Sequence, residues 1–185
     1  MSPAMTALRA AAILPVLVAT GFSLVGTPVA AADNRRLNDS VVANVYTAQH
    51  QAGCTTNIKI NPKLRLAAQW HTNDVLNNRA LNGDIGSDGS TVADRARNAG
   101  YDGVVAETVA INPALAISGV EILNQWWYRP DYHATMHDCS NVDIGVWSEN
   151  MIDRTVVVAV YGKGDGGSPV PAPGREFGNV PGWTP

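Results

Sequence analysis

The segment Leu81–Tyr101, LNGDIGSDGSTVADRARNAGY, gathers carboxylates, hydroxyls and glycines in a pattern that could serve a cation. Asp84, Asp88 and Gly89 match the first, fifth and sixth places of an EF-hand calcium loop. That loop requires a bidentate Glu at its twelfth place, where this chain has the cationic side chain of Arg95. The spacing therefore excludes an EF-hand.

The same segment is explained as a turn followed by a short helix. The glycines of GSDGS allow a tight reversal, Ser90 is expected to cap a helix over residues 91–99, and Gly100 is expected to end it. Asp94 in the first turn and Arg97 near the end would each be favoured by the helix dipole. As local structure, a connector is the better interpretation.

The remaining sequence places most helices before a late pair of strands. Apolar periodicity predicts helices over residues 37–51, 62–81, 91–99 and 120–128. Asn61 with Pro62 marks one helix start, and Ser118 with Glu121 forms a capping box at another. Runs of β-branched residues predict strands over 104–111, 142–147 and 154–162, the last two as a hairpin. This order predicts an α+β fold with a sheet between helices.

The ends of the chain differ in composition from its middle. Arg9, a long apolar run and the small residues 30–32 have the layout of a secretory signal peptide cleaved after Ala32. Pro15 and the shortness of the run favour cleavage over a membrane anchor. The predicted parts are a signal peptide over 1–32, a domain over 33–162 and a Gly/Pro-rich tail over 163–185. We therefore expect a secreted protein whose mature form has no transmembrane span.

Charge and cysteine content indicate which partners the protein can have and in which compartment it is found. The formal net charge is −3 at pH 7 and the basic residues are scattered, which argues against a nucleic-acid partner. Cys54 and Cys139 are the only cysteines. In an exported chain such a pair most simply forms a disulfide, and two buried free thiols are the alternative.

The order of motifs resembles the bacterial branch of the CAP superfamily, which comprises cysteine-rich secretory, antigen five and pathogenesis-related-one proteins. The blocks LAAQWHTNDVL, GSDGS-x-x-x-DRARNAGY, VAET and WYRPDYH follow one another within residues 37–162. The resemblance implies an α-β-α sandwich (the CAP, or SCP-like, fold) with a central, largely antiparallel sheet. It also implies a disulfide between Cys54 and Cys139, as in some bacterial members.

Family members commonly direct two histidines and one or two acids into a cleft that can hold a divalent cation. The resemblance places Asp84 where one family histidine stands and Glu107 where the family has its acid. The second family histidine ends a Trp-x-x-Ser-Pro-x-His run, which is assigned here to Trp127, Arg129, Pro130 and His133. The cleft residues expected from the resemblance are thus Asp84, Glu107, Trp127 and His133.

These residues leave two interpretations of the cleft. In one, Asp84, Glu107 and His133 bind a weakly held divalent cation, with a preference for magnesium, manganese or iron. In the other, which we favour, the cleft has degenerated, Asp84 is a turn residue and Glu107 pairs with an arginine, so that no cofactor is bound. Of the other histidines, His71 is expected to be a hydrogen-bonded core residue and His137 to lie exposed in a loop.

The resemblance implies a secreted module that binds a lipid, sterol, polysaccharide or protein, and association with the cell wall is a further option. The alternative is a hydrolase, metal-dependent or based on Glu107 and His133, in the same cleft. No G-x-S-x-G nucleophile elbow is present in the sequence. We therefore favour a non-catalytic binding module.

Overall fold

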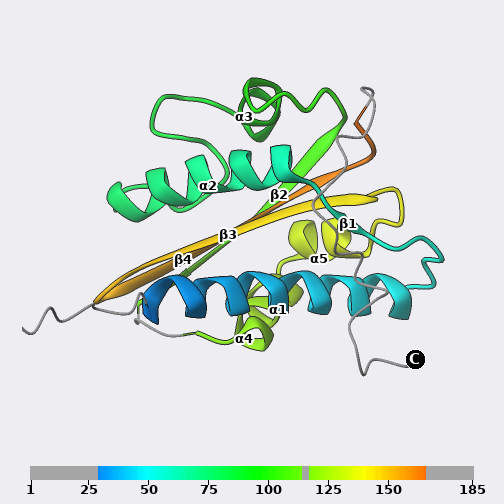
Figure 1. The fold of residues 1–185 in the computed structure, drawn as a ribbon, viewed down its shortest axis with the longest axis horizontal. Helices are drawn as coiled ribbons and strands as arrows, with labels where there is room; N and C mark the ends of the chain where they lie inside the picture. The colour runs from blue at the N-terminus through cyan, green and yellow to red at the C-terminus, as the bar shows by residue number, and fades with distance from the viewer. Residues whose placement is uncertain (1–28, 114–116, 166–185) are drawn as a thin grey trace, which may run out of the picture.

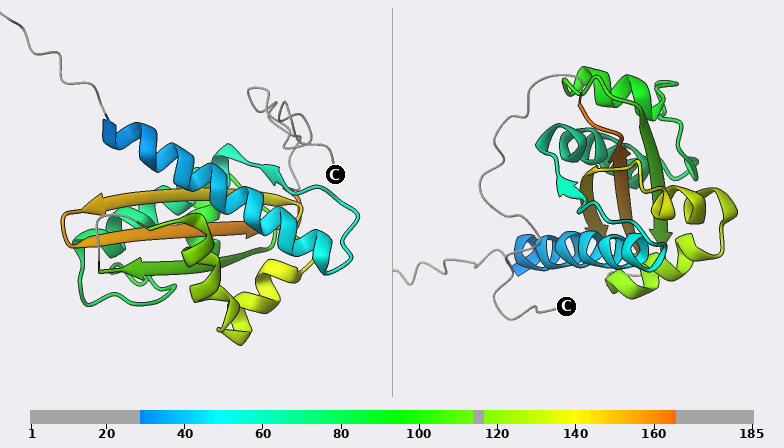
Figure 2. Two further views of the ribbon diagram at one scale, coloured as in Figure 1. Left: turned by 90° about the horizontal axis from the view of Figure 1, so that it is seen from below. Right: turned by 90° about the vertical axis from the view of Figure 1, so that its right-hand side faces the viewer.

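A mixed sheet lies between two layers of helices (Figure 1) in the computed structural model, which describes residues 29–113 and 117–165. The two views of Figure 2 show the same layers from below and from the side. The described helices are α1 (Val29–Gln51), α4 (Gly119–Trp127) and α5 (Pro130–His137) on one face, with α2 (Pro62–Asn77) and α3 (Val92–Asn98) on the other. Each face buries its own apolar cluster. The predicted α+β class and α-β-α sandwich are confirmed.

The sheet is antiparallel except at one edge. Its strands are β1 (Lys59–Ile60), β2 (Val105–Asn112), β3 (Asp143–Met151) and β4 (Arg154–Gly162), in the order β1-β3-β4-β2. The short β1 is parallel to β3, whereas β2 and β3 both run antiparallel to β4. Strand β4 is buried along its whole length, which explains its continuous apolar run TVVVAVY. Strand β2 forms the edge of the sheet opposite to β1, and it carries the acid Glu107.

Helix α2 lies unusually close to the sheet. A Cβ atom on Gly145 of β3 would stand only 2.0 Å from the backbone nitrogen of Arg65 in α2. Glycine is therefore required at this crossing, because any side chain would push the helix away. The same helix turns Leu64, Ala68 and His71 toward the interior.

Two helix starts follow local capping rules, and one cap differs from its prediction. The Asn61 side chain accepts a hydrogen bond from the backbone of Lys63 at the start of α2, as predicted. Thr91, and not Ser90, caps α3, because its hydroxyl accepts from the backbone N–H of Asp94 while the Asp94 carboxylate accepts from the Thr91 backbone. That reciprocal pair needs an acid three residues after the cap, which Thr91 has.

The other differences concern element ends, the two-residue strand β1, which was not predicted, and one helix. Helix α1 begins at Val29 instead of residue 37, since no glycine or proline interrupts residues 29–36. Helix α2 ends at Asn77, and β3 continues to Met151, so the hairpin loop is shorter than expected. The helix α5 was not predicted from the sequence, because its eight residues show little apolar periodicity.

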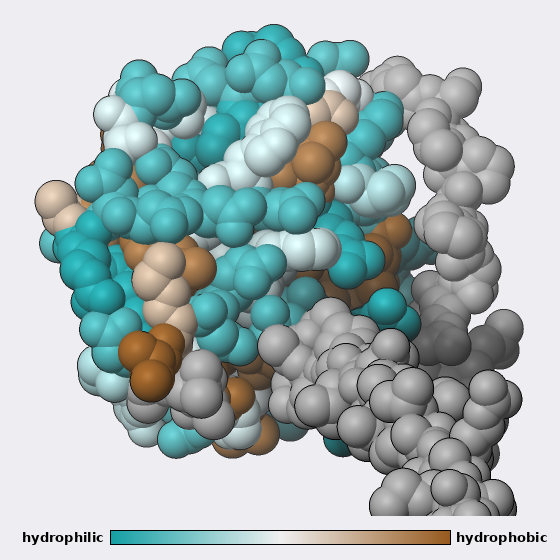
Figure 3. Space-filling model, turned by 60° about the vertical axis from the view of Figure 1, so that its left-hand side comes forward, coloured by the Kyte–Doolittle hydropathy of each residue, from teal (hydrophilic) through white to brown (hydrophobic). Residues whose placement is uncertain are grey.

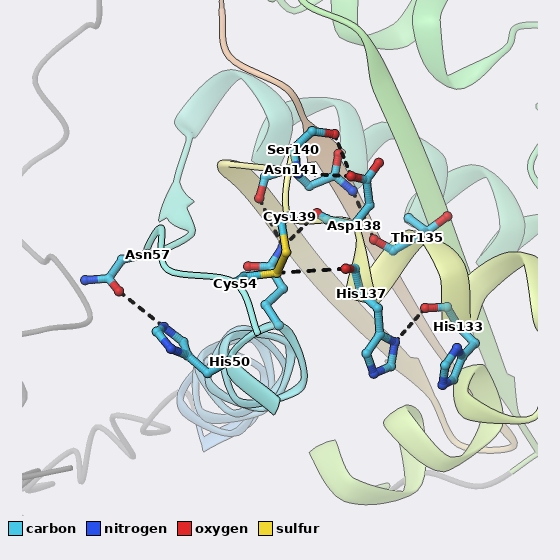
Figure 4. Close-up of a disulfide and its surroundings, with 11 residues drawn as sticks. His50, Cys54, Asn57, His133, Thr135, His137, Asp138, Cys139, Ser140 and Asn141 are labelled. Carbon is cyan, nitrogen blue, oxygen red and sulfur yellow. Dashed lines mark hydrogen bonds between the residues drawn. A yellow bond between two sulfur atoms is a disulfide. The ribbon is translucent and has the colours of Figure 1, made fainter. Parts of the chain in front are cut away.

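The disulfide joins Cys54 to Cys139 and closes a loop across 85 residues of sequence. It connects the turn after α1 to the turn after α5 (Figure 4). Beside it, the side chain of Gln49 donates to the backbone carbonyl of Asn141 at 3.0 Å. The end of α5 is thereby fixed to the end of α1.

The first residues of the predicted tail are attached to the domain. The Asp165 carboxylate pairs with the Lys63 ammonium at 2.5 Å, and the backbone N–H of Gly164 donates to the Tyr101 hydroxyl at 3.0 Å. The rest of the tail, and the predicted signal peptide up to residue 28, lie outside the described residues. The described helices include none that is long and apolar enough to cross a membrane. On the face drawn in Figure 3, hydrophilic residues predominate and apolar ones are scattered.

Candidate functional site

Glu107 reaches the interior because of its place on the edge strand β2. Side chains alternate between the two faces of a strand, and Val105, Val109 and Ile111 belong to the apolar cluster under α2 and α3. Glu107 shares their parity and therefore points to the same layer, where its side chain is fully buried. An acid in this position needs a partner, since a buried charge is costly without one.

Arg95 of α3 supplies that partner. Its Nη2 atom donates to Glu107 Oε1 at 2.7 Å and to the backbone carbonyl of Asp84 at 2.8 Å. Its Nη1 atom donates to the backbone carbonyl of Ser90 at 2.8 Å. One guanidinium thus holds together α3, the loop before it and the edge strand. The arginine is itself only 5% exposed.

His71 approaches the same acid from α2. Its Nε2 atom lies 3.0 Å from the carbonyl oxygen of Gly83, which can only accept, so Nε2 carries the hydrogen. The same atom is 3.6 Å from Glu107 Oε1. Burial, with the nearby Arg95 charge, lowers the pKa of His71 below its ordinary value. The prediction of a buried, hydrogen-bonded core histidine is confirmed.

Asp84 and Tyr132 complete the group. The Tyr132 hydroxyl, on α5, donates to Asp84 Oδ1 at 2.6 Å, and the Arg129 guanidinium lies 3.7 Å above the Tyr132 ring. Burial and the adjacent Asp84 carboxylate both raise the pKa of Tyr132, so the phenol stays protonated and remains a donor. We call the following residues the buried charged cluster: His71, Asp84, Arg95, Glu107 and Tyr132.

The protonation of Glu107 reflects competing effects. Burial raises its pKa to about 8, and the neighbouring Asp84 charge acts in the same direction, while Arg95 opposes the rise by stabilising the carboxylate. The Oε2 atom of Glu107 has no hydrogen-bond partner within the described residues. A carboxyl group that is buried, bonded to a guanidinium and has a raised pKa is a poor ligand for a cation.

Comparisons with known proteins address the fold. No family model matches the sequence, and no curated protein matches it. An outer surface protein from Borrelia burgdorferi aligns with a TM-score of 0.58 and 14% identity, over 67% of this chain and 90% of that one. A cysteine-rich secretory protein from Staphylococcus aureus aligns with a TM-score of 0.51 and 13% identity, over 71% of this chain and 39% of that one. The chain has a CAP-like fold.

An extracellular SCP-domain protein from Bacillus anthracis supports the same conclusion, with a TM-score of 0.52 and 12% identity over 72% of this chain and 44% of that one. This chain therefore spans less than half the length of the Staphylococcus and Bacillus proteins. At such low identities the comparison establishes a CAP-like fold. It does not transfer an activity.

Within this CAP-like fold, Asp84 and Glu107 both belong to the buried charged cluster, whereas His133, the third residue expected to bind a cation, does not join them. In the described ranges, no three His, Cys, Asp or Glu side chains are grouped so that they could hold a metal ion. Asp84 accepts from a tyrosine hydroxyl and Glu107 accepts from a guanidinium. His133 stacks instead against another histidine, His137, with ring centroids 4.0 Å apart.

The position expected for the second family histidine is occupied by Tyr132, one residue before His133. The family run Trp-x-x-Ser-Pro-x-His fits the chain when it begins at Trp126, with Arg129, Pro130 and Tyr132 at the last three named places. Trp126 is fully buried, whereas Trp127 is 39% exposed and contacts His133. Counted from Trp126, the run therefore ends at Tyr132, and the placing of Trp127 and His133 in a cleft stays a prediction.

Sequence reasoning missed two members of the buried charged cluster. Arg95 entered only as the residue that disqualifies a calcium loop, although it lies in the specific block DRARNAGY. Tyr132 could have been found from the four-residue spacing between Trp126 and Pro130. In the CAP-like fold, Tyr132 bonds directly to Asp84, so the two places expected for family histidines face each other without an imidazole.

Proposed function

We propose that this chain is an exported CAP-like domain that acts as a binding and interaction module and not as an enzyme. The observation that carries the proposal is the bond of 2.7 Å between the Arg95 guanidinium and Glu107 Oε1. A cation or a substrate at this acid would have to displace a buried arginine that also holds two backbone carbonyls. Breaking such a pair leaves an uncompensated buried charge, which costs about 3–5 kcal/mol.

The nearby hydroxyl groups support the same proposal. Ser87 Oγ donates to the Asp74 carboxylate at 2.6 Å, and Ser90 Oγ accepts from Arg95 at 3.2 Å. Neither serine contacts a histidine that could activate it as a nucleophile, among the hydrogen bonds of the described residues. Both hydroxyls therefore serve the turn and the arginine.

Export and an extracellular ligand are the remaining parts of the proposal. The apolar segment within residues 1–32 and the disulfide support an oxidising compartment. Proteins with the same fold include an outer surface protein and an extracellular protein. The ligand class that we propose is lipid, sterol, polysaccharide or protein, with the cell wall as one location. The scattered basic residues do not support nucleic acid as a partner.

One observation favours the second candidate, a hydrolase that uses Glu107. A carboxyl group with a pKa of about 8 titrates near neutral pH, which suits general acid–base catalysis. Against it, the side chain is fully buried and its bonded oxygen faces Arg95. Esterase and peptidase substrate panels separate the two candidates. Turnover that is lost in both Glu107→Gln and His133→Ala would establish the hydrolase.

The proposal that the buried charged cluster binds no divalent cation is tested by thermal melting of the exported chain in Mg²⁺, Mn²⁺ and chelator. Hard cations prefer carboxylates, so they would reveal a site at Asp84 and Glu107. We expect the same melting temperature in all three conditions and no additional response in Asp84→Ala. A stabilising shift in Mn²⁺ that Asp84→Ala abolishes would overturn this view. Native mass spectrometry of the exported protein then identifies the bound ligand directly.

A further inference from the structure

Helix α5 carries two half-buried histidines one turn apart, on the side that faces Trp127 of α4. His133 and His137 are separated by four residues, which places their side chains on the same helical face. Their ring centroids are 4.0 Å apart and their planes differ by 25°. Figure 4 shows the two rings lying side by side and extending from the helix in the same direction. We call these two residues the imidazole pair.

A hydrogen bond fixes the tautomer of one ring. His137 Nδ1 lies 2.7 Å from the backbone carbonyl oxygen of His133, and because a carbonyl only accepts, Nδ1 donates. In the neutral ring the hydrogen is then on Nδ1 and the lone pair is on Nε2. Metal-binding histidines usually have this arrangement, in which a carbonyl or carboxylate orients the ring and the other nitrogen binds the ion. His137 is therefore oriented as a ligand through Nε2.

Trp127 holds the pair from the side. Its ring lies edge-on to both imidazoles, at 4.7 Å from His133 and 4.9 Å from His137 between ring centroids. Both histidines are half-buried, so solvent and ions can still reach them. The disulfide at Cys139, two residues beyond His137, fixes the end of the helix. Because stacked rings direct their lone pairs along nearly parallel lines, one ring has to rotate before both can bind the same ion. His137 is fixed by its hydrogen bond, whereas none of the hydrogen bonds of the described residues holds the His133 ring, so His133 is the ring that can rotate toward the ion.

The charged groups around the pair are engaged with one another. Arg129 bonds to Asp131 at 2.9 Å at the start of α5, and Lys163 lies 2.9 Å from Asp138 just after its end. No third histidine, cysteine or acid in the described part of the chain joins the pair as a potential ligand. Two neutral imidazoles would therefore be the protein ligands, and water would fill the other positions.

We propose that His133 and His137 form a two-imidazole site for a divalent transition metal, binding Cu²⁺ more tightly than Ni²⁺ or Zn²⁺. Imidazole nitrogen suits these three ions, and the Irving–Williams order ranks Cu²⁺ first at a given set of ligands. Two histidines four residues apart on one helix face are a known zinc-binding arrangement. The site lies apart from the buried charged cluster, because the preceding residue, Tyr132, bonds to Asp84. It does not depend on the proposed binding function.

The test measures ion binding to the full exported chain by calorimetry and tryptophan fluorescence. Cu²⁺ should bind once at this site and quench the indole of Trp127, which lies against both imidazoles. In His133→Ala and His137→Ala, binding should weaken at least as much as the roughly 10–100-fold seen on loss of an outer-shell partner, because here a ligand itself is lost. His50→Ala is the matched control, since His50 is exposed at the end of α1, where it contacts Asn57 and Tyr46.

Further variants locate the ion and test the chemistry. Trp127→Phe should keep the calorimetric binding and lose the quenching. Binding should weaken in acid, since protons compete for the same nitrogens. Unchanged Cu²⁺ affinity in either histidine variant, or no Cu²⁺ binding to the wild type, would each overturn the proposal. A shift in melting temperature with Mn²⁺ that depends on Asp84 would instead contradict the proposal for the buried charged cluster, and it would not bear on the imidazole pair.

Discussion

Tyr132 and His133 are consecutive residues of α5, yet they belong to two regions with opposite properties. Tyr132 turns inward and bonds to Asp84, within a cluster whose charged groups neutralise and bond one another. His133 turns outward, stacks on His137 and lies against the half-exposed Trp127. Consecutive helical residues diverge by about 100°, so a single step along α5 passes from one region to the other.

The comparison shows that a concentration of titratable residues does not by itself make a reactive site. The buried charged cluster has the more varied set of functional groups, but its principal donors and acceptors already bind protein atoms. The imidazole pair has only two such groups, and the Nε2 atom of His137 has no hydrogen bond among those found in the described chain. Solvent access distinguishes the second region from the first, because Glu107 also has an oxygen without a hydrogen bond but is fully buried.

The largest expected effect comes from the disulfide that fixes the imidazole pair. Replacing Cys54 and Cys139 together by serine should lower the free energy of unfolding by roughly 4–5 kcal/mol for the 85-residue separation. Urea unfolding measures the loss. Cu²⁺ affinity should fall as well, because the end of α5 is no longer fixed. If the free energy of unfolding falls by less than about 1 kcal/mol, the chain-entropy account of this disulfide is wrong.

The next effect tests the tightness of the buried charged cluster. Arg95→Met should destabilise the domain by about 3–5 kcal/mol, since Glu107 Oε1 and the backbone carbonyls of Asp84 and Ser90 all lose their donor. Arg97→Met is the matched control on the same helix, because Arg97 is exposed, and it should change stability by about 0.5 kcal/mol or less. Equal results for the two variants would show that burial of the pair has little energetic importance.

The pH dependence of stability separates Glu107 from the other acids. Its folded pKa of about 8 lies above its ordinary value, so the folded state holds a proton that the unfolded state releases, and stability falls as pH rises toward and through 8. His71 acts oppositely, because its lowered pKa makes stability fall in acid, below the ordinary range of imidazole. Measurements between about pH 7 and 9 therefore isolate Glu107.

In that interval Glu107→Gln should remove most of the decline in stability, whereas Glu149→Gln at the half-buried end of β3 should retain it. Equilibrium unfolding at a series of pH values provides the comparison. Identical slopes in the wild type and in Glu107→Gln would mean that Glu107 is ionised throughout, with Arg95 outweighing the effect of burial.

The smallest expected effects compare the two adjacent residues directly. Tyr132→Phe removes one oxygen atom and should cost about 1–3 kcal/mol, because Asp84 loses its short hydrogen bond. His133→Ala removes a whole ring and should cost only about 0.5–1.5 kcal/mol, the usual worth of an aromatic contact. Chemical denaturation measures both. A larger loss for His133→Ala would reverse the inward and outward assignment.

Most of the fold could be predicted because its signals are local. The Asn61 cap, the Ser118 capping box and the β-branched strands 142–147 and 154–162 each depend on neighbouring residues. Helix α5 lacks such a signal, since it is short and its apolar residues show little periodicity. Its length and position therefore depend on packing against β2 and α1.

The candidate site was less predictable because its contacts join distant segments. The sequence suggested that Glu107 pairs with an arginine, but only the fold selects Arg95, which the α3 helix brings to the edge strand. The family run leads to Tyr132 when it is counted from Trp126, one position before the expected His133. On a helix one position rotates a side chain by about 100°, here from the buried Tyr132 to the half-buried His133.

The glycine at position 145 has a consequence beyond its own strand. Because a methyl group there would overlap the backbone of Arg65, the start of α2 rests directly on β3. His71 lies about two helical turns further along α2, so its distance from the sheet depends on this close contact. The absence of a side chain at Gly145 therefore sets the distance between α2 and the sheet, and with it the distance at which His71 approaches Glu107.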